Sequence, residues 1–199
     1  MGWREEVARE KVSRFRDWEY WGRPLPGFGD SNAELVVVGL APAAHGGNRT
    51  GRIFTGDSSG DWLYRALYRA SYANQQTSTH REDGLHLTGA YVTAVVRCAP
   101  PGNRPTPAER DSCLPYLERE LRLMPWRVIV ALGSFAYDGV ARATALRPRP
   151  AFGHGVEVPL GDGRTIICSY HPSQQNTFTR KLTQVMFDAI FSRARELAA

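Results

Sequence analysis

The sequence predicts an α/β domain in which helices cover both faces of a parallel sheet. Four short apolar runs rich in Val, Ile and Ala are typical of buried strands. A segment with the apolar spacing of an amphipathic helix follows each of them. This alternation indicates parallel strands joined by crossover helices. The four runs lie at residues 34–39, 90–96, 128–132 and 165–169.

The composition is that of one domain spanning residues 1–199, with 42% hydrophobic residues and a formal net charge of +5 at pH 7. The positive charge indicates an anionic partner such as nucleic acid, although it can also serve solubility alone. The sequence has no apolar run of membrane-spanning length, and its charged N-terminus lacks the apolar core of a signal peptide. We therefore expect a cytoplasmic protein, and the odd count of three cysteines argues against a disulfide framework.

Capping and turn signals predict where the elements begin and end. Thr106 and Glu109 form a capping box that predicts the start of one helix, and residues 58–61 supply N-cap side chains for another. A glycine turn at 161–163 joins a further strand, 156–160, to the last core strand. Helices are expected over residues 1–19, 60–72, 107–123 and 135–145, and from about residue 179 onward.

An aromatic segment with two prolines and three glycines, residues 17–29, is expected to be irregular. Its rings could stack on bases. Such aromatics more often anchor an irregular segment to the core, and we favour that interpretation. The four rings belong to Trp18, Tyr20, Trp21 and Phe28.

The loop after the first core strand, residues 39–57, is the first candidate site, because ligands of open α/β sheets bind beyond the carboxyl ends of the strands. It is rich in glycine and basic residues, and we expect it to be exposed and flexible. Its segment GGNRTGRI has the glycine spacing of a P-loop, but Arg52 and Ile53 stand where lysine and a hydroxyl residue are required, which excludes a nucleotidase of that type. Arg49 and Arg52 remain candidate phosphate contacts, with a solvated loop as the equal alternative.

His171 is the second candidate, because it follows the last core strand and precedes Pro172, which favours an extended backbone. It is expected to project over the same edge of the sheet as residues 39–42. General acid, neutral hydrogen-bond donor, metal ligand and structural histidine all remain open as its role.

The cysteines are the third candidate. Cys98 ends a strand and Cys113 lies on the following helix. Two thiols rarely hold a cluster, because iron–sulfur sites normally need four cysteines. Two buried free cysteines are the alternative, and Cys168 is expected to pack within a core strand. From the residues alone, a DNA- or RNA-directed enzyme is favoured.

Three segments together resemble the uracil-DNA glycosylase superfamily, and its type-5 branch most closely. They are GLAPAAHGGNRTGRIFTGDSSGDWLYRAL from residue 39, TAVVRCAPPGNRPTPAERDSC from residue 93 and SYHPSQQNTFTRKLT from residue 169. The resemblance covers nearly the whole chain. It implies a three-layer α/β/α sandwich with a central four-stranded parallel sheet.

The resemblance also implies an activity. Such enzymes flip a damaged base out of DNA and hydrolyse its N-glycosidic bond, which leaves an abasic site in an uncut strand. Catalysis then needs a donor at the carbonyl of the departing base and negative charge near the sugar, which develops oxocarbenium character. The implied partner is double-stranded DNA, and single-stranded DNA as well, bound by a monomer associated with the nucleoid of a prokaryote.

Matching motif positions imply roles for individual residues. His171 would stabilise the departing base, and Phe54 would stack on the flipped base. The pocket floor would be formed by Gly39, Leu40, Ala41 and Pro42. Contacts to DNA would fall to Arg49, Arg52, Ser173, Gln174, Gln175, Asn176 and Arg180.

Two departures from the superfamily pattern affect chemistry and specificity. Ala41 stands at the usual acid or amide of the first motif, and Asp57 resembles its substitute, with Asp61 as the alternative acid and Asn103 as a second candidate for positioning water. Ala94 stands where many relatives carry an asparagine that reads the uracil edge. Because hydrogen-bonding sites reject analogues strongly, this loss predicts a substrate range that includes hypoxanthine, xanthine or larger modified pyrimidines.

A third departure concerns a cofactor. The resemblance implies a [4Fe-4S] cluster held by four cysteines, two of them in a C-x-x-C pair just before the segment that resembles WREEVARE. The sequence begins at Met1 without that pair, and Cys98 and Cys113 alone stand at matching positions. Either the start of the sequence is truncated or misassigned, or this member does without the cluster. In both cases we expect that the chain as written cannot complete a four-thiolate site and shows no iron–sulfur absorbance.

Two other functions compete with a monofunctional DNA glycosylase of base excision repair. One is a non-catalytic nucleic-acid-binding relative of the same fold. The other is a small-molecule α/β hydrolase or transferase, which the absence of a G-x-S-x-G elbow and of a P-loop disfavours.

Overall fold

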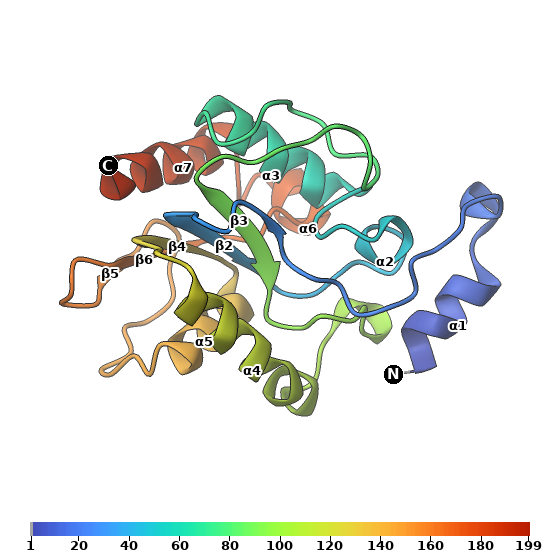
Figure 1. The fold of residues 1–199 in the computed structure, drawn as a ribbon, viewed down its shortest axis with the longest axis horizontal. Coiled ribbons are helices and arrows are strands. Elements are labelled where there is room, and N and C mark those ends of the chain that lie inside the picture. Colours follow the sequence, from blue (N-terminus) through green and yellow to red (C-terminus); the bar gives the residue numbers. More distant parts are fainter. Residues whose placement is uncertain (1) are drawn as a thin grey trace.

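The computed structural model describes residues 2–199 and contains a mixed sheet between two layers of helices (Figure 1). The sheet has six strands in the order β1-β3-β2-β4-β6-β5, and the inner four are parallel while the two edge strands pair antiparallel. The predicted fold class is therefore confirmed. A short strand lies at each edge, and of these β5 corresponds to the strand expected over 156–160, whereas β1 was not expected. The strands are β1 (Phe28–Gly29), β2 (Leu35–Gly39), β3 (Ala90–Ala94), β4 (Val128–Leu132), β5 (Glu157–Pro159) and β6 (Thr165–Ser169).

The register of the inner strands explains their apolar sequences. Val37 of β2 pairs with Val92 on one side and with Val130 on the other. Every residue of β2 and β4 is buried, as expected for strands with helices on both faces. The carboxyl ends of the four parallel strands consequently meet at one edge of the sheet.

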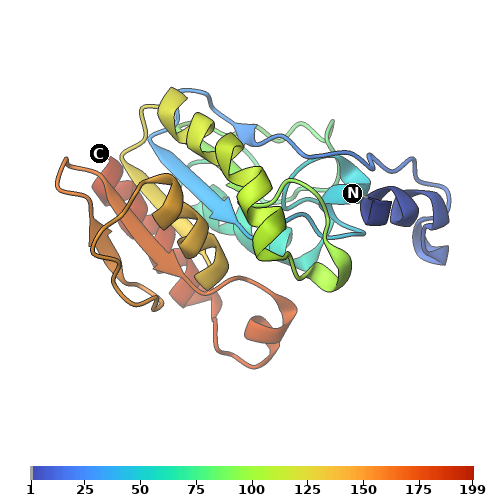
Figure 2. The same cartoon turned by 90° about the horizontal axis from the view of Figure 1, so that it is seen from below.

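Two helices cover each face of the sheet (Figures 1 and 2). α3 and α7 enclose a core that includes Leu67 and Phe187, and α4 and α5 enclose a second core that includes Leu117 and Val140. The predicted capping box is present, because the Thr106 hydroxyl accepts from the Glu109 N–H and the Glu109 carboxylate accepts from the Thr106 N–H. The helices are α3 (Ser58–Arg69), α4 (Pro107–Leu123), α5 (Ser134–Ala143) and α7 (Gln184–Ala198).

The predicted first helix, residues 1–19, is wrong in its extent. In the described residues, α1 (Gly2–Glu10) ends where Lys11 adopts a φ of 54° and Val12 becomes extended, and one turn of 3-10 helix, η1 (Ser13–Phe15), follows. This N-terminal arm, residues 2–18, lies beside the short helix α2 (Gly47–Thr50) at one end of the molecule (Figure 1).

Two other helix starts also differ from the expectation. The N-cap of α3 is Asp57, one residue before the range predicted. The last helix begins at Gln184 with Thr183 as its N-cap, because Arg180 at a φ of 58° separates it from a short helix, α6 (Gln174–Phe178), in the segment expected to be a loop.

The aromatic segment 17–29 anchors to the core, which confirms the interpretation we favoured. Tyr20 is buried, and Trp21 and Phe28 pack against the core beneath α3. Trp18 differs, because its side chain stays 37% exposed.

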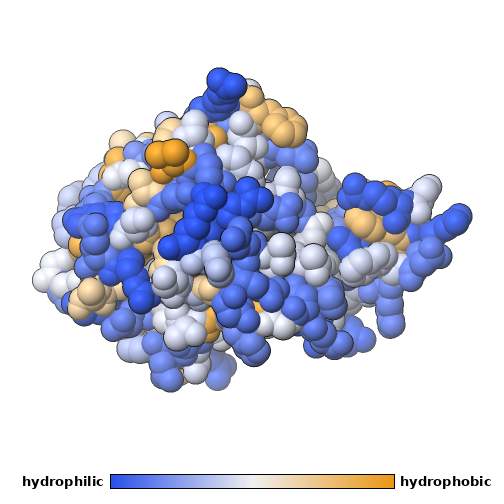
Figure 3. Space-filling view, turned by 90° about the horizontal axis from the view of Figure 1, so that it is seen from above, coloured by the Kyte–Doolittle hydropathy of each residue, from blue (hydrophilic) through white to orange (hydrophobic). Residues whose placement is uncertain are grey.

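The surface shows no large apolar area on the face drawn in Figure 3, which is mostly hydrophilic with small, separate hydrophobic groups. Among the helices of residues 2–199, none is long and apolar enough to cross a membrane.

Candidate active site

A cavity of about 740 Å³ lies at the carboxyl edge of the sheet. Its walls come from the loop after β2, the start of α3, a 3-10 turn called η2 (Pro101–Asn103) and the loop that leads into α6. A cavity of this size accepts a ligand as large as a nucleoside. The predicted site residues that line it are Leu40, Ala41, Phe54, Asp57, Asn103, His171, Ser173, Gln174 and Gln175.

Asp57 faces this cavity from the first position of α3. Its Oδ1 accepts a hydrogen bond of 3.0 Å from the N–H of Gly60, as an N-cap aspartate does. Burial raises the pKa of Asp57 above its ordinary value, and the N–H groups of Gly60 and Ser59 oppose that rise. A Cβ at Gly46 would lie 2.1 Å from Oδ2, so glycine is needed there for the carboxylate to keep its place. Asp61, the alternative acid, is exposed.

The rings of Phe54 and His171 lie against each other in the cavity wall, with centroids 5.8 Å apart and an interplanar angle of 30°. Phe54 adopts a φ of 51°, which is uncommon for a bulky residue. The Phe54 ring also lies close to Gly39, where a Cβ would come within 2.5 Å of the ring. The end of β2 therefore supports the Phe54 ring through a glycine.

Burial lowers the pKa of His171 to about 4. The imidazole is therefore neutral at neutral pH, as a neutral hydrogen-bond donor requires. The Asn176 side-chain amide donates to the His171 carbonyl at 2.9 Å, so α6 fixes the backbone that carries the ring.

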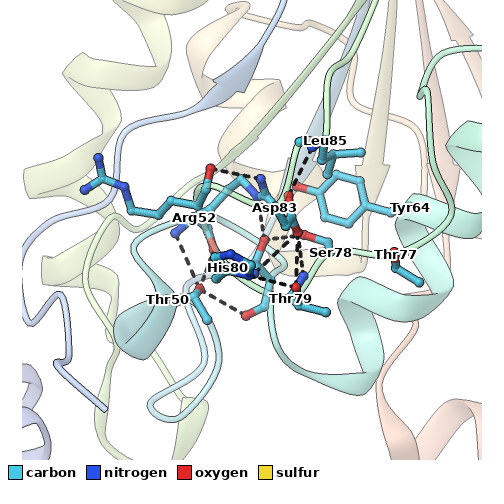
Figure 4. Close-up of polar contacts among 12 residues, drawn as sticks. Thr50, Arg52, Tyr64, Thr77, Ser78, Thr79, His80, Asp83 and Leu85 are labelled. Atoms are coloured by element: carbon cyan, nitrogen blue, oxygen red, sulfur yellow. Dashed lines mark hydrogen bonds and ion pairs between the residues drawn. The ribbon is translucent and has the colours of Figure 1, made fainter.

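Arg52 is buried, and the expectation that it lies in an exposed flexible loop is wrong. Its guanidinium forms an ion pair of 2.6 Å with Asp83 and donates to the hydroxyls of Thr55 and Ser78 (Figure 4). Burial would raise the pKa of Asp83, but hydrogen bonds from Arg52 and from two backbone N–H groups hold it well below its usual range. The network fastens the segment after Arg52 to the loop 73–84.

Arg49 is also buried rather than exposed. Its Nε donates to the His45 carbonyl at 2.7 Å and one terminal nitrogen donates to the Gly56 carbonyl at 3.1 Å. The side chains of Arg49 and Arg52 are 4% and 3% exposed, so both are committed to the interior and neither presents a free guanidinium to a phosphate. A glycine-rich basic sequence does not reveal this, because internal carbonyls satisfy arginine as well as phosphates do.

Several cavity residues were missed by sequence reasoning. Arg14 of the N-terminal arm and Arg104 after η2 line the cavity, and both are exposed. His45 also lines it and shares a 3.0 Å hydrogen bond with the Tyr20 hydroxyl. His45 could have been found from its place in the loop after β2, whereas Arg14 carried no signal. The remaining residues are Ala43, Ala44, Gly46, Gly56, Ser58, Ser59 and Gly102.

Besides Arg49 and Arg52, five predicted pocket and DNA-contact residues lie outside the lining of this cavity in the described structure. Gly39, Pro42 and Ala94 lie behind it, because they are buried at or just after the strand ends. The Asn176 side chain contacts the backbone carbonyl of His171 instead. Arg180 is exposed beyond α6.

The residues present do not fit a four-cysteine cluster. Cys168 is buried in β6, as predicted, and Cys98 and Cys113 are only partly buried. The Cys98 sulfur accepts a hydrogen bond of 3.0 Å from the Arg4 guanidinium. No group of three or more His, Cys, Asp and Glu side chains within residues 2–199 could hold a metal ion, so no chemical step is derived through a cluster.

The sequence was compared with known protein families and with curated proteins. The family model described as the uracil DNA glycosylase superfamily matches residues 26–195. A type-5 uracil-DNA glycosylase of Mycobacterium tuberculosis is 54% identical over 100% of this chain and 75% of its own length. One of Thermus thermophilus is 48% identical over 100% of this chain and 90% of its own length.

A solved structure supports the fold independently. A solution NMR structure from Methanosarcina acetivorans, described as a candidate uracil DNA glycosylase, superposes with a TM-score of 0.53 at 15% identity and covers 86% of this chain and 97% of its own. At that identity the likeness concerns the fold alone. The match of the family model and the identity to full-length relatives establish more: this chain belongs to the uracil DNA glycosylase superfamily and, with it, to the DNA glycosylases, which are hydrolases of N-glycosyl bonds.

Proposed function

We propose that the protein excises uracil from DNA by hydrolysing the N-glycosidic bond, and that it leaves an abasic site. The observation that carries this proposal is the presence of Asp57, Phe54 and His171 on the wall of one cavity. An acid, a stacking ring and a neutral donor are the groups that such a hydrolysis needs. The relatives named as type-5 uracil-DNA glycosylases support the choice of uracil.

In the proposed mechanism, separate groups stabilise the negative charge that develops on the base and the positive charge that develops on the sugar. The flipped base stacks on Phe54 and leaves as an anion, and the neutral imidazole of His171 donates a hydrogen bond to its carbonyl oxygen. The Asp57 carboxylate stabilises the oxocarbenium-like sugar or orients the attacking water. Asn103, which also lines the cavity, is a second candidate for holding that water.

The outer part of the site is proposed to receive the DNA strand. Gln174 and Gln175 are exposed on the first turn of α6 and would enter the space that the flipped nucleotide leaves. Exposed Arg14, Arg104 and Arg180 replace the two buried arginines as proposed phosphate contacts. We propose double-stranded and single-stranded DNA as substrates of a monomer.

We further propose that deaminated purines, hypoxanthine and xanthine, are also excised. Ala94 offers no amide that would discriminate between bases, because its side chain ends at Cβ. A cavity of about 740 Å³ does not exclude a purine by size. A protein that excises uracil and leaves both purines untouched would contradict this part alone.

One assay tests the proposal. Duplexes that contain uracil, hypoxanthine or xanthine are incubated with the protein, and alkali-labile abasic sites are counted in single turnovers. Asp57→Asn and His171→Gln should each lower the rate by about 100-fold or more. Asp61→Asn, the exposed acid on the same helix, is the matched control and should keep the parent rate. DNA binding without any abasic product would favour the alternative, a non-catalytic relative.

A further inference from the structure

Arg49 is a buried cation that two aromatic rings of the N-terminal arm enclose. Its Cζ lies 3.9 Å from the centroid of the Phe15 ring and 4.0 Å from that of the Trp18 ring. The two rings meet edge to face at 77°, so they form a corner that receives the guanidinium. Contacts of this kind stabilise a desolvated cation.

The same guanidinium supports the segment that ends in Asp57. It donates to the carbonyls of His45 and Gly56, and both residues line the proposed active site. The packing at Gly56 is close, since a Cβ there would lie 2.5 Å from the Arg49 nitrogen. Arg49 therefore joins the segment at His45 and Gly46 to the segment at Gly56 and Asp57.

The partners of Arg49 leave its positive charge uncompensated. Among the described residues, its guanidinium meets backbone carbonyls and aromatic faces, and no carboxylate lies within ion-pair distance of it. Aromatic faces and carbonyls stabilise a cation without cancelling its charge as a carboxylate would. The field of Arg49 is thus available to Asp57, and it favours the ionised carboxylate against the effect of burial.

Other charged groups also act on Asp57. Asp61 of α3 opposes ionisation of Asp57. Arg14 from the arm, Arg104 after η2, and the imidazoles of His45 and His171 line the same cavity. Both imidazoles have pKa values lowered chiefly by burial, so they are neutral at neutral pH, and the two exposed arginines are screened by solvent. Arg49 is the buried cation of this set.

We propose that Arg49 is a positioning residue for Asp57, and that Phe15 and Trp18 of the N-terminal arm hold its guanidinium in place. The proposal rests on the catalytic role of Asp57 proposed above. The arm, which is distant in sequence from every motif of the site, then contributes to the charge state of the reacting carboxylate.

The experiment compares pH–rate profiles of uracil excision in single turnovers for Arg49→Met, Arg49→Lys, Phe15→Ala and Trp18→Ala. Arg49→Met should move the acid limb to higher pH by up to about one unit, and so lower the rate on that limb by up to about 10-fold, because the ionised carboxylate loses an opposite charge. Arg49→Lys keeps the positive charge, so its acid limb should lie close to that of the parent protein. Phe15→Ala and Trp18→Ala should move the limb in the same direction by less.

Arg16→Gln is the matched control on the same arm. The Arg16 side chain is 80% exposed and pairs with an exposed aspartate, so its loss should leave both rate and limb unchanged. A titration of the Asp57 carboxyl by carbon-13 NMR, assigned with Asp57→Asn, provides a readout that does not require activity.

The outcomes separate the inference from the proposed function. If Asp57→Asn abolishes excision while Arg49→Met leaves the acid limb and the Asp57 titration unchanged, the inference is wrong and the function stands. If Asp57→Asn keeps full activity, the catalytic assignment is wrong, and the NMR titration alone still decides whether Arg49 acts on Asp57. If Arg49→Met does not fold, the acid limb and the Asp57 titration of Trp18→Ala decide instead. The Trp18 ring is partly exposed, so its removal should disturb the fold less.

Discussion

The imidazole of His171 lies against the ring of Phe54, with 5.8 Å between the ring centroids. Gly39 also lies close to the Phe54 ring, since a Cβ at residue 39 would come within 2.5 Å of it. A planar base between the two rings would need about 7 Å, twice the ~3.5 Å of a carbon–carbon contact. The observed separation is therefore too small for a base to lie between the Phe54 and His171 rings.

From this spacing we predict that base binding moves the two rings apart. His171 should leave the face of Phe54 and reach the edge of the base, where its N–H can meet a carbonyl oxygen. Ring-proton NMR shifts of both residues should change when an abasic duplex and free uracil are added, because each ring loses the shielding of the other. Unchanged shifts in the presence of bound product would contradict this movement.

A second prediction concerns stability below neutral pH. The folded-state pKa of His171 is about 4 and its unfolded value is about 6.5, so the unfolded chain binds a proton in this window while the folded protein does not. The free energy of unfolding should therefore fall as the pH drops from 6.5 toward 4. The part due to His171 is about 2 kcal/mol.

Urea unfolding of the parent and of His171→Gln at pH 7 and pH 4.5 measures this contribution. The variant should lose less stability than the parent on acidification. Asp57 and the other carboxyls titrate in both proteins, so their effects cancel in the comparison. Equal losses in the two proteins would show that the folded protein protonates His171 as readily as the unfolded chain does.

The sequence predicts the frame of this molecule well because each strand and helix carries a local signal. The β-branched run of β4 and the capping box of Thr106 and Glu109 depend on few neighbours, and both are present as expected. The motif residues Phe54, Asp57 and His171 also meet in one cavity, because strand ends in a parallel sheet share an edge.

What the sequence does not reveal is the burial of charged side chains in the loop after β2. Arg49 and Arg52 stand among glycines, which usually indicates exposure, yet carbonyls, aromatic rings and Asp83 satisfy them inside. Their partners come from other segments, so no local pattern encodes the contact. The same reason hides Arg14, which reaches the cavity because the chain turns at Lys11.

A third prediction concerns the ion pair of Arg52 and Asp83, whose side chains are only 3% and 6% exposed. Asp83→Asn leaves the Arg52 charge buried without a counterion and should cost about 3–5 kcal/mol in the free energy of unfolding. The double variant with Arg52→Met should cost less than the sum of the two single variants.

Urea unfolding of the parent, both single variants and the double variant provides the coupling energy. Asp162→Asn is the control, because Asp162 and Arg164 form an ion pair with side chains 47% and 41% exposed. Solvent screens that pair, so its loss should change the free energy of unfolding far less than the loss of the buried pair does. If the double variant instead loses as much unfolding free energy as the two single variants together, Arg52 and Asp83 have no coupling energy, and the ion pair itself does not stabilise the fold.

The last prediction separates the two roles of Asp57, which caps α3 through Oδ1 and presents its carboxylate to the cavity. Asparagine caps a helix about as well as aspartate does, whereas alanine cannot accept the Gly60 N–H. Asp57→Ala should therefore lose about 1 kcal/mol of unfolding free energy from the missing cap, and Asp57→Asn should lose little of it. Both variants should lose excision to the same degree, because neither carries the negative charge that the sugar needs. Thermal unfolding and single-turnover excision, measured on the same preparations, provide the two readouts. If Asp57→Asn keeps its excision activity while Asp57→Ala loses it, Asp57 acts only as the cap of α3. The acid would then have to be another residue of the cavity.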